Sequence, residues 1–521
     1  MFRRLLVAVA AAALVAYSVA LVLYSGRFPA PGQEGVAKQD VLLLVGATLV
    51  ASFLHVAACV AAHGRPPRLR HILLVGAGVR VLLLFGAPGP VLEGDPARLR
   101  FDARLVNQGI NPYEFTPRSL QDEEPSDIVM TGASVDRLIL ARAAMTASSD
   151  APRPEEVTRP DLRTNATPLQ LWIGAACDRF KPGSTRGFAY AILVADSLAI
   201  FFIILALRSL SLPVGWVIVY AWCPVLLKEA YCSLSVDAFV LPALAFLVWC
   251  LASGRRLLGA VPLALAGGLR LALLALLPAC GRRIGILGAM LSVVLLVIPF
   301  LPLQSPEVPA RRYLEGNVHV WRHYEYNSML ENPLRGALGR APAEAENSLA
   351  LAGIPLIEPG DLLHAFVAKV LGLVVLLAVS VYLLIRWGYG VEDQAEAGLS
   401  DLFVMVAALL VVSPILTPAQ AIWLLPLIAV QPRGIAWLAL PGLTCLCYVT
   451  HLEGPMAADL TLLDGEVSFR VVEYGAFAFL LFLDLLWRGR ILPRRDRAPA
   501  SGRVAPAEAA GREREPIALA H

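Results

Sequence analysis

The chain has 521 residues, of which 57% are hydrophobic and 16% are charged, and its mean hydropathy is +0.65. Soluble domains carry about 25% charged residues, so this composition excludes an ordinary soluble protein and predicts a membrane protein. The formal net charge of +3 is too small to indicate a nucleic-acid partner.

Apolar runs of about 20 residues are long enough to cross a bilayer as helices. The first run has a basic start like that of a secretory signal, but its length predicts a retained membrane helix. We therefore expect an all-α polytopic membrane protein with about twelve crossings. The expected spans are 4–24, 40–62, 71–91, 184–207, 212–229, 233–253, 284–303, 362–386, 399–416, 418–431, 435–451 and 469–488.

Residues 257–281 are apolar but are interrupted by Gly267, Gly268 and Arg270. A pair of arginines lies on each side of this segment, and the positive-inside rule assigns both pairs to the cytoplasm. We therefore expect a re-entrant hairpin of two half-helices instead of a crossing. With this choice the other basic connections and both ends of the chain are also cytoplasmic.

The same topology gives two large extracytoplasmic loops, at 92–183 and 304–361. Within the first loop, residues 118–164 are polar, with Pro and Asp interspersed, and we expect an ordinary solvated loop there. Residues 1–488 are expected to form one membrane-embedded domain. Residues 489–521 are rich in Arg, Ala and Pro and are expected to be a disordered basic tail in the cytoplasm.

The densest group of ionisable and turn residues outside the membrane is the stretch 93–117, which directly follows an apolar run. It contains two carboxylates, Asp95 and Asp102, with Arg98 between them and a Gly-Ile-Asn-Pro-Tyr turn after them. Asp95 is followed by Pro96, which is also the pattern of a helix N-cap. The sequence leaves a chemical role and a capping role open for Asp95.

Ionisable residues at membrane depth cost about 2.5–3.5 kcal/mol each on insertion, so each is a functional candidate. Lys228 and Glu229 end one apolar run and Asp237 opens the next, which puts them at the outer surface, level with Asp95. The alternative is a snorkelling lysine beside a carboxylate that faces headgroup water. Arg270 either pairs within the bundle or points to the cytoplasm.

The second outer loop is basic and aromatic between residues 311 and 327. Arginine binds phosphate through its planar fork, so the basic side chains favour an anionic ligand outside the membrane. An interfacial aromatic belt is the alternative. The residues concerned include Arg311, Arg312, Arg322, His323 and Asn327.

The chain reads D-P-A-R-L-R-F-D-A from Asp95 and G-I-N-P-Y from Gly109. These segments resemble D-x-x-R-Y-x-W-D-G and G-x-N-P-Y of the bacterial polyprenyl-phosphate-mannose mannosyltransferases, which belong to the GT-C superfamily of integral membrane glycosyltransferases. Leu99, Phe101 and Ala103 replace the Tyr, Trp and Gly of the first motif.

Further segments follow the order of that family between about residue 70 and residue 488. They include T-P-L-Q ending at Gln170, an N-S pair at Asn327 and an E-Y pair at Glu473. Val236 and Thr417 stand where the family has His. These two replacements leave open a different sugar or acceptor, and also a relative without activity.

The resemblance implies a GT-C-type bundle that transfers a sugar with inversion, mannose in the family, from a polyprenyl phosphate to a lipid or glycan acceptor. The reaction would occur on the outer side of a bacterial cytoplasmic membrane. Asp95 is the implied catalytic base and Asp102 the second choice. No metal or cofactor is expected, because the leaving group is a phosphate monoester and no His/Asp cluster has the spacing of metal ligands, while cations can stabilise the leaving phosphate without protonation. The expected substrate-binding residues are Arg98, Asn111, Tyr113, Gln170, Lys228, Glu229, Asp237, Arg311, Arg312, Arg322, His323 and Asn327.

Two other functions are compatible with the sequence. A lipid or solute transporter would suit an even number of crossings and a broken hairpin, but the two halves of the chain show no internal symmetry. A non-catalytic GT-C relative that acts in envelope assembly would suit the two lost His residues.

Overall fold

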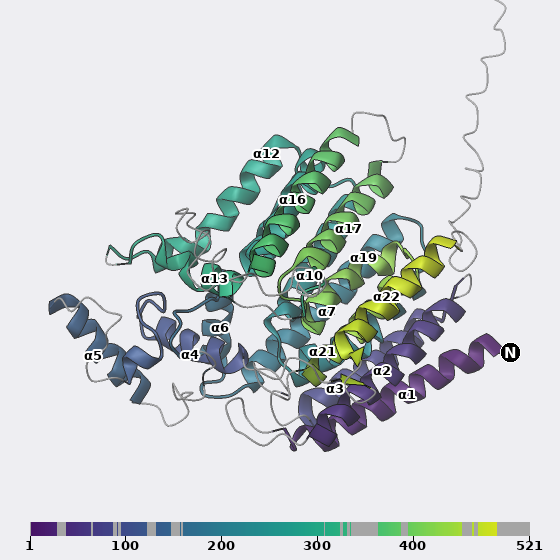
Figure 1. Cartoon of the computed structure of the whole chain (residues 1–521), viewed down its shortest axis with the longest axis horizontal. Coiled ribbons are helices and arrows are strands. Elements are labelled where there is room, and N and C mark those ends of the chain that lie inside the picture. The colour runs from purple at the N-terminus through teal and green to yellow at the C-terminus, as the bar shows by residue number, and fades with distance from the viewer. Residues whose placement is uncertain are drawn as a thin grey trace, which may run out of the picture.

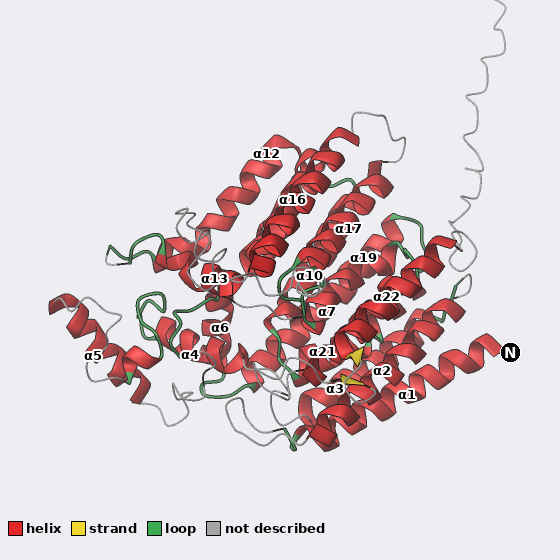
Figure 2. Ribbon diagram, viewed as in Figure 1, coloured by secondary structure: helices red, strands yellow, loops and turns green. Residues whose placement is uncertain are grey.

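The computed structural model describes residues 2–28, 38–63, 66–86, 91, 95–121, 132–146, 157, 160–306, 308–323, 327–330, 334, 363–386, 394–450, 461–462 and 467–486. This part of the chain is almost entirely helical (Figure 2). The exception is a short antiparallel pair, β1 (Thr461–Leu462) with β2 (Val467–Ser468). The expected tail, 489–521, lies outside the described residues.

Long apolar helices form the body of the molecule (Figure 1). Seven helices in the described ranges are long and apolar enough to cross a membrane, so the protein is an all-α integral membrane protein. They are α1 (Phe2–Ser25), α2 (Lys38–Ala61), α3 (Leu69–Gly86), α7 (Arg186–Ser209), α12 (Leu277–Val297) with η8 (Ile298–Leu303), α16 (Leu363–Arg386) and α17 (Gln394–Val412).

Several expected spans are broken. Residues 212–229 form η3 (Val214–Val217), α8 (Ile218–Ala221), α9 (Pro224–Leu227) and the start of the π-helical η4 (Lys228–Cys232). The break precedes Pro224 because proline disfavours a helical conformation in the residue before it, and Cys223 is extended.

After η4 the chain turns sharply into the next helical segment, η5 (Val236–Phe239) with α10 (Val240–Ala252). The two apolar pieces, Pro224–Cys232 and Val236–Ala252, are bent by 111° and together make one further candidate span. The count of about twelve crossings stays a prediction.

Two more expected spans are also built from short pieces. Residues 418–431 form α18 (Pro418–Ala421), η9 (Ile422–Leu424) and α19 (Leu425–Val430). Residues 435–451 form α20 (Ile435–Leu443), η10 (Thr444–Leu446) and α21 (Cys447–Thr450), whereas the last expected span is the single helix α22 (Phe469–Leu486).

Residues 257–281, which are expected to form a re-entrant hairpin, fold into two helical arms, and the re-entrant placement in a membrane stays a prediction. The first arm is η6 (Leu257–Gly259) with α11 (Ala260–Leu269), and the second is η7 (Leu271–Leu276) with the start of α12. The arms lie against each other along their length, since a Cβ on Gly259 would be 2.8 Å from Ile284 and one on Gly267 would be 2.5 Å from Leu274. Arg270 is therefore at the tip of the hairpin.

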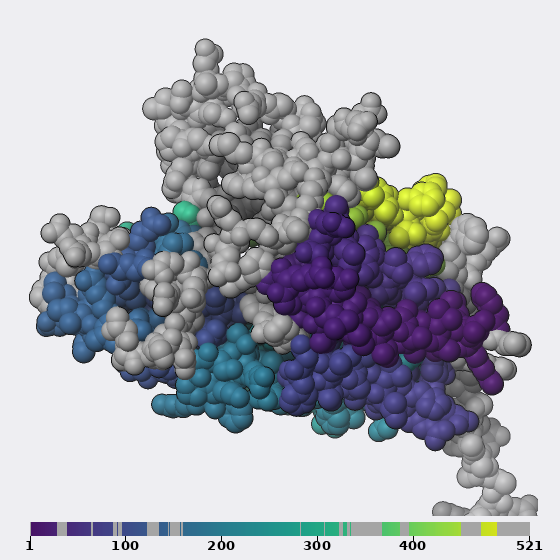
Figure 3. Space-filling model, turned by 90° about the horizontal axis from the view of Figure 1, so that it is seen from below, coloured from purple at the N-terminus to yellow at the C-terminus, as the bar shows by residue number. Residues whose placement is uncertain are grey.

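A smaller layer of helices covers one end of the bundle, away from the N-terminus (Figure 1). It contains α4 (Asp95–Asn107), η1 (Arg118–Leu120), α5 (Gly132–Thr146), α6 (Pro168–Phe180) and α13 (Arg312–His323). Seen from below, the segment around α4 to α6 projects beside α1 to α3 (Figure 3).

This layer corrects the expectation of a plain solvated loop at 118–164. Helix α5 lies inside that range and contributes Leu138 and Ala141 to a small apolar core with Phe101 and Leu105 of α4. Positions 138 and 141 are one helical turn apart, so they share one face of α5.

Candidate functional site

Asp102 is buried inside the smaller layer of helices at the end of the bundle, called the outer layer below because the sequence predicts it to be extracytoplasmic, and is held by Arg98. The Arg98 Nε donates a hydrogen bond of 3.1 Å to Asp102 Oδ2, while its NH2 group donates to the Leu162 carbonyl at 2.8 Å. Only 1% of Asp102 is exposed. Burial raises the pKa of Asp102, and the positive charge of Arg98 and a hydrogen bond from Thr164 oppose the rise. In this arrangement both residues fasten α4 to the chain that leads into α6.

Asn111 and Tyr113 also make structural contacts. Asn111 Oδ1 accepts from the Tyr113 backbone N–H at 3.0 Å, and its Nδ2 donates to the Leu303 carbonyl at 2.6 Å. The Tyr113 hydroxyl donates to the Ala166 carbonyl at 2.7 Å, and burial raises its pKa. These bonds tie the predicted turn to the end of the bundle.

Asp95 begins α4, and its side chain lies outside the described residues. The backbone just before it is fixed to η4. The Val91 N–H donates to the Cys232 carbonyl at 2.8 Å, and the Ser233 hydroxyl donates to the Val91 carbonyl at 3.0 Å. Val91, four residues before Asp95, is thus bonded to the end of η4, and the common level expected for Asp95 and Lys228 stays a prediction.

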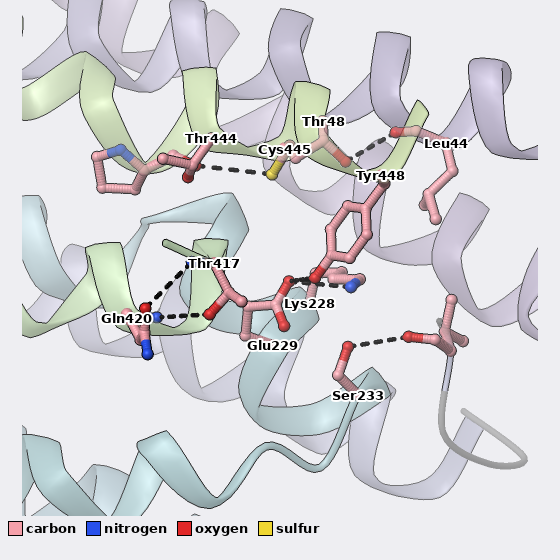
Figure 4. A network of polar contacts seen from close by, with 12 residues as sticks. Leu44, Thr48, Lys228, Glu229, Ser233, Thr417, Gln420, Thr444, Cys445 and Tyr448 are labelled. Carbon is pink, nitrogen blue, oxygen red and sulfur yellow. Dashed lines mark hydrogen bonds and ion pairs between the residues drawn. The ribbon is translucent and has the colours of Figure 1, made fainter. Parts of the chain in front are cut away.

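Lys228 and Glu229 form a buried polar centre in η4. Lys228 Nζ lies 2.9 Å from Glu229 Oε1, and the Tyr448 hydroxyl donates to the same oxygen at 2.7 Å (Figure 4). The Lys228 Nζ also lies 3.9 Å from the centre of the Tyr448 ring. Lys228 is 1% exposed and Glu229 is 0% exposed, so a lysine snorkelling to headgroup water is wrong. Single π-helical turns are frequent at functional sites.

Asp237 and Arg270 pair across the bundle. Arg270 donates from Nε at 2.8 Å and from NH2 at 2.9 Å, one bond to each Asp237 oxygen, and Trp423 Nε1 donates to Asp237 at 3.2 Å. Of the two possibilities open for Arg270, pairing inside the bundle is confirmed. Its side chain is 28% exposed.

Asn327 joins the second outer loop to the last helix. Its Nδ2 donates to Glu473 Oε1 at 2.9 Å and to the Leu416 carbonyl at 3.3 Å, and the Tyr474 hydroxyl donates to its Oδ1 at 2.8 Å. The φ of Asn327 is 55°, a left-handed conformation that asparagine tolerates better than most residues. The E-Y pair of α22 thus positions a residue predicted to bind substrate.

Gln170 serves in a helix cap. Its Oε1 accepts from the Thr167 backbone while its own N–H donates to the Thr167 hydroxyl, which makes a capping box at the start of α6. Its Nε2 donates to the Leu269 carbonyl at 2.7 Å, next to the hairpin tip. Thr417 and Gln420 form the same box at the start of α18. Both Thr-Pro-x-Gln segments therefore have a structural explanation.

The basic residues of the second outer loop do not contact the Lys228–Glu229 centre through any hydrogen bond found among the described residues. Arg311 is exposed just before α13, and Arg312 is partly exposed. Burial lowers the pKa of Arg312, and the nearby charge of Arg163 lowers it further. The side chains of Arg322 and His323 lie outside the described residues.

Sequence reasoning missed a buried ion pair between α3 and α7. Arg80 donates to Asp196, which also accepts from the Tyr231 hydroxyl at 2.7 Å. Arg80 NH1 donates to the Ala221 carbonyl at 2.8 Å, where α8 ends. The sequence does contain a signal for this pair, because Arg80 and Asp196 are each a charged residue inside an expected membrane span.

The described residues contain no group of three or more His, Cys, Asp or Glu side chains that could hold a metal ion. No family model, curated protein or solved structure matches the chain.

Proposed function

We propose that the protein is a GT-C-type glycosyltransferase that moves a sugar, mannose by resemblance, from a polyprenyl phosphate to a lipid or glycan acceptor on the outer face of a bacterial cytoplasmic membrane. The observation that carries the proposal is the buried Lys228–Glu229 centre, connected through Val91 to the backbone from which α4 and Asp95 begin. Charges at membrane depth are expensive, which favours a functional reason for keeping them.

The proposed reaction needs a base and a stabilised leaving group. An acceptor hydroxyl attacks the anomeric carbon, its proton passes to the Asp95 carboxylate, and the bond between that carbon and the lipid phosphate oxygen breaks. A positioned base contributes about 10²–10⁴-fold. The leaving phosphate needs a cation, and we assign this role to the arginines of the second outer loop.

The test is sugar transfer by the purified protein from polyprenyl-phosphate mannose to a lipid acceptor. Asp95→Asn should reduce the rate by about 100-fold or more. Asp161→Asn is the matched control, because the Asp161 side chain is 59% exposed and its ion pair among the described residues is with the similarly exposed Arg118, at 2.7 Å. Transfer by the Asp95→Asn protein at the wild-type rate would remove Asp95 from the reaction, and no transfer by wild-type protein with several acceptors would favour a non-catalytic relative.

A lipid transporter is the second candidate. It is favoured by the Arg80–Asp196 pair within two membrane helices and by the helical hairpin, both of which occur in proteins with moving parts. Proteoliposomes containing a fluorescent polyprenyl phosphate separate the two functions. Lipid translocation without sugar transfer would support the transporter.

A further inference from the structure

Two buried carboxylates each leave one oxygen without a hydrogen-bond partner. Among the described residues, the buried carboxylate oxygens without a partner are Glu229 Oε2 and Glu473 Oε2. Both residues are 0% exposed. An unsatisfied buried polar atom costs about 1–3 kcal/mol and more when it is charged, so two such oxygens require a reason.

The other oxygen of each carboxylate is held in place. Glu229 Oε1 accepts from Lys228 and Tyr448, while Glu473 Oε1 accepts from Asn327 at 2.9 Å. Each carboxyl group is therefore fixed by one oxygen, while its other oxygen has no hydrogen-bond partner among the described residues. The two carboxyl groups are therefore preorganised, and preorganisation reduces the entropy lost when side chains are ordered on ligand binding.

Both carboxylates are next to the turn that starts α18. Asn327, which binds Glu473, also donates to the Leu416 carbonyl at the beginning of this turn. On the other side, α18 packs against η4, which contains Glu229. Figure 4 shows Glu229 and Lys228 beside Thr417 and Gln420. The thiol of Cys445 lies within electrostatic range of both carboxylates.

The turn has donor capacity of its own. Gln420 is partly exposed although the helix that it starts is otherwise buried. Its Oε1 accepts from the Thr417 backbone, but its Nε2 makes no hydrogen bond to a described residue. Two carboxylate oxygens without partners and this amide provide two acceptors and one donor on the elements around α18.

We propose that Glu229, Glu473 and Gln420 form a subsite for a hydroxyl-rich sugar ring, with the two carboxylates accepting from hydroxyls and the amide donating. This inference rests on the proposed function and adds to it the residues that hold the sugar. Sugar recognition then takes place inside the bundle beside α18, separate from the arginines of the second outer loop. Glu473 becomes a substrate-binding residue, a role for which its sequence motif gave no chemical reason.

Binding of polyprenyl phosphate with and without a mannosyl group measures the sugar contribution directly and needs no turnover. Wild-type protein should bind the mannosyl lipid more tightly than the bare lipid phosphate. Glu473→Gln should reduce this preference by about 10-fold, the usual size for a lost hydrogen bond to a charged group, while leaving affinity for the bare lipid unchanged. Glu229→Gln should act likewise.

Gln420→Glu provides a variant that keeps the capping oxygen and removes the amide donor, so the preference should fall while the helix cap survives. Thermal unfolding shows which variants fold. If Glu229→Gln does not fold, Glu473→Gln and Gln420→Glu are sufficient to test the subsite. An equal affinity of wild-type protein for both lipids, or an unchanged preference in the folded variants, overturns the subsite. A preference that these variants abolish, together with no sugar transfer, would refute the transferase and leave the subsite standing.

Discussion

Charged side chains inside this protein are paired across helices that are distant in sequence. Arg80 with Asp196 and Arg270 with Asp237 join segments more than 30 residues apart, and Glu229 is bonded to Tyr448 at a separation of 219 residues. Burial of an ion costs desolvation free energy, and the attraction between the paired charges offsets part of that cost. Each pair therefore makes the position of one helix depend on another.

Removing one partner of a buried ion pair should lower the unfolding free energy by much more than the intact pair adds to it. Asp196→Asn leaves the guanidinium of Arg80 buried without a counter-charge, and we expect a loss of about 3–5 kcal/mol in unfolding free energy. The double variant Arg80→Met with Asp196→Leu should recover most of it. Thermal unfolding in detergent measures both. Asp161→Asn, in an exposed pair, should change stability by at most about 1 kcal/mol, and an equal loss in both single variants would contradict the argument.

Asp102 should make stability depend on pH. Burial raises its pKa above the unfolded value of about 3.9, so the folded protein binds the proton more tightly than the unfolded chain. Its contribution to stability is then complete below pH 4 and is lost as the pH rises through the folded pKa. Relative to Asp102→Asn, wild-type protein should lose thermal stability between pH 4 and neutral pH. A relative gain would mean that the ion pair with Arg98 outweighs burial.

At the scale of elements, one glycine separates the hairpin from the membrane helix that follows it. Gly285 has φ 79° and ψ 167° inside α12, a conformation that is essentially restricted to glycine. A Cβ at this position would meet no atom within 4 Å, so the constraint comes from the backbone alone. The kink lets the second arm of the hairpin end beside Gly259 while residues 286–303 leave in a new direction.

Gly285→Ala should therefore destabilise the protein by about 1–3 kcal/mol, without any steric clash. Gly281→Ala is the matched control, because this glycine lies four residues earlier in the same helix and a Cβ there also meets nothing within 4 Å. The control should be neutral or stabilising by up to about 1 kcal/mol. Equal effects on the unfolding temperature would remove the special role of the kink.

The elements that could be predicted from the sequence are those determined by residues close together in the chain. Uniform apolar runs predicted helices such as α1 and α7, and Gly267, Gly268 and Arg270 predicted the hairpin. The break at Pro224 also has a local cause, but its run was interpreted as one span because composition outweighed a single proline. The Asn327–Glu473 contact joins residues 146 positions apart, and no local pattern specifies such a pairing.

For the whole molecule, the orientation in the membrane decides whether the proposed chemistry is accessible. The outer layer with α4 and the basic connection after α10 should face opposite sides, because three crossings are expected between residues 184 and 253. All eight native cysteines are buried. A membrane-impermeant maleimide should therefore react poorly with the wild-type protein, because a thiol must be accessible to react. Introduced cysteines can then report each side.

Asp161→Cys should react with this reagent in intact spheroplasts, because its position is exposed in the outer layer. Arg255→Cys, exposed after α10, should react only once the membrane is permeabilised. The same reagent after detergent extraction confirms that both thiols are reactive. Reversed labelling would place the outer layer and Asp95 in the cytoplasm, where a sugar carried on the outer leaflet cannot reach them. Labelling of both from outside would instead mean that residues 184–253 cross the membrane an even number of times, against the three crossings expected there.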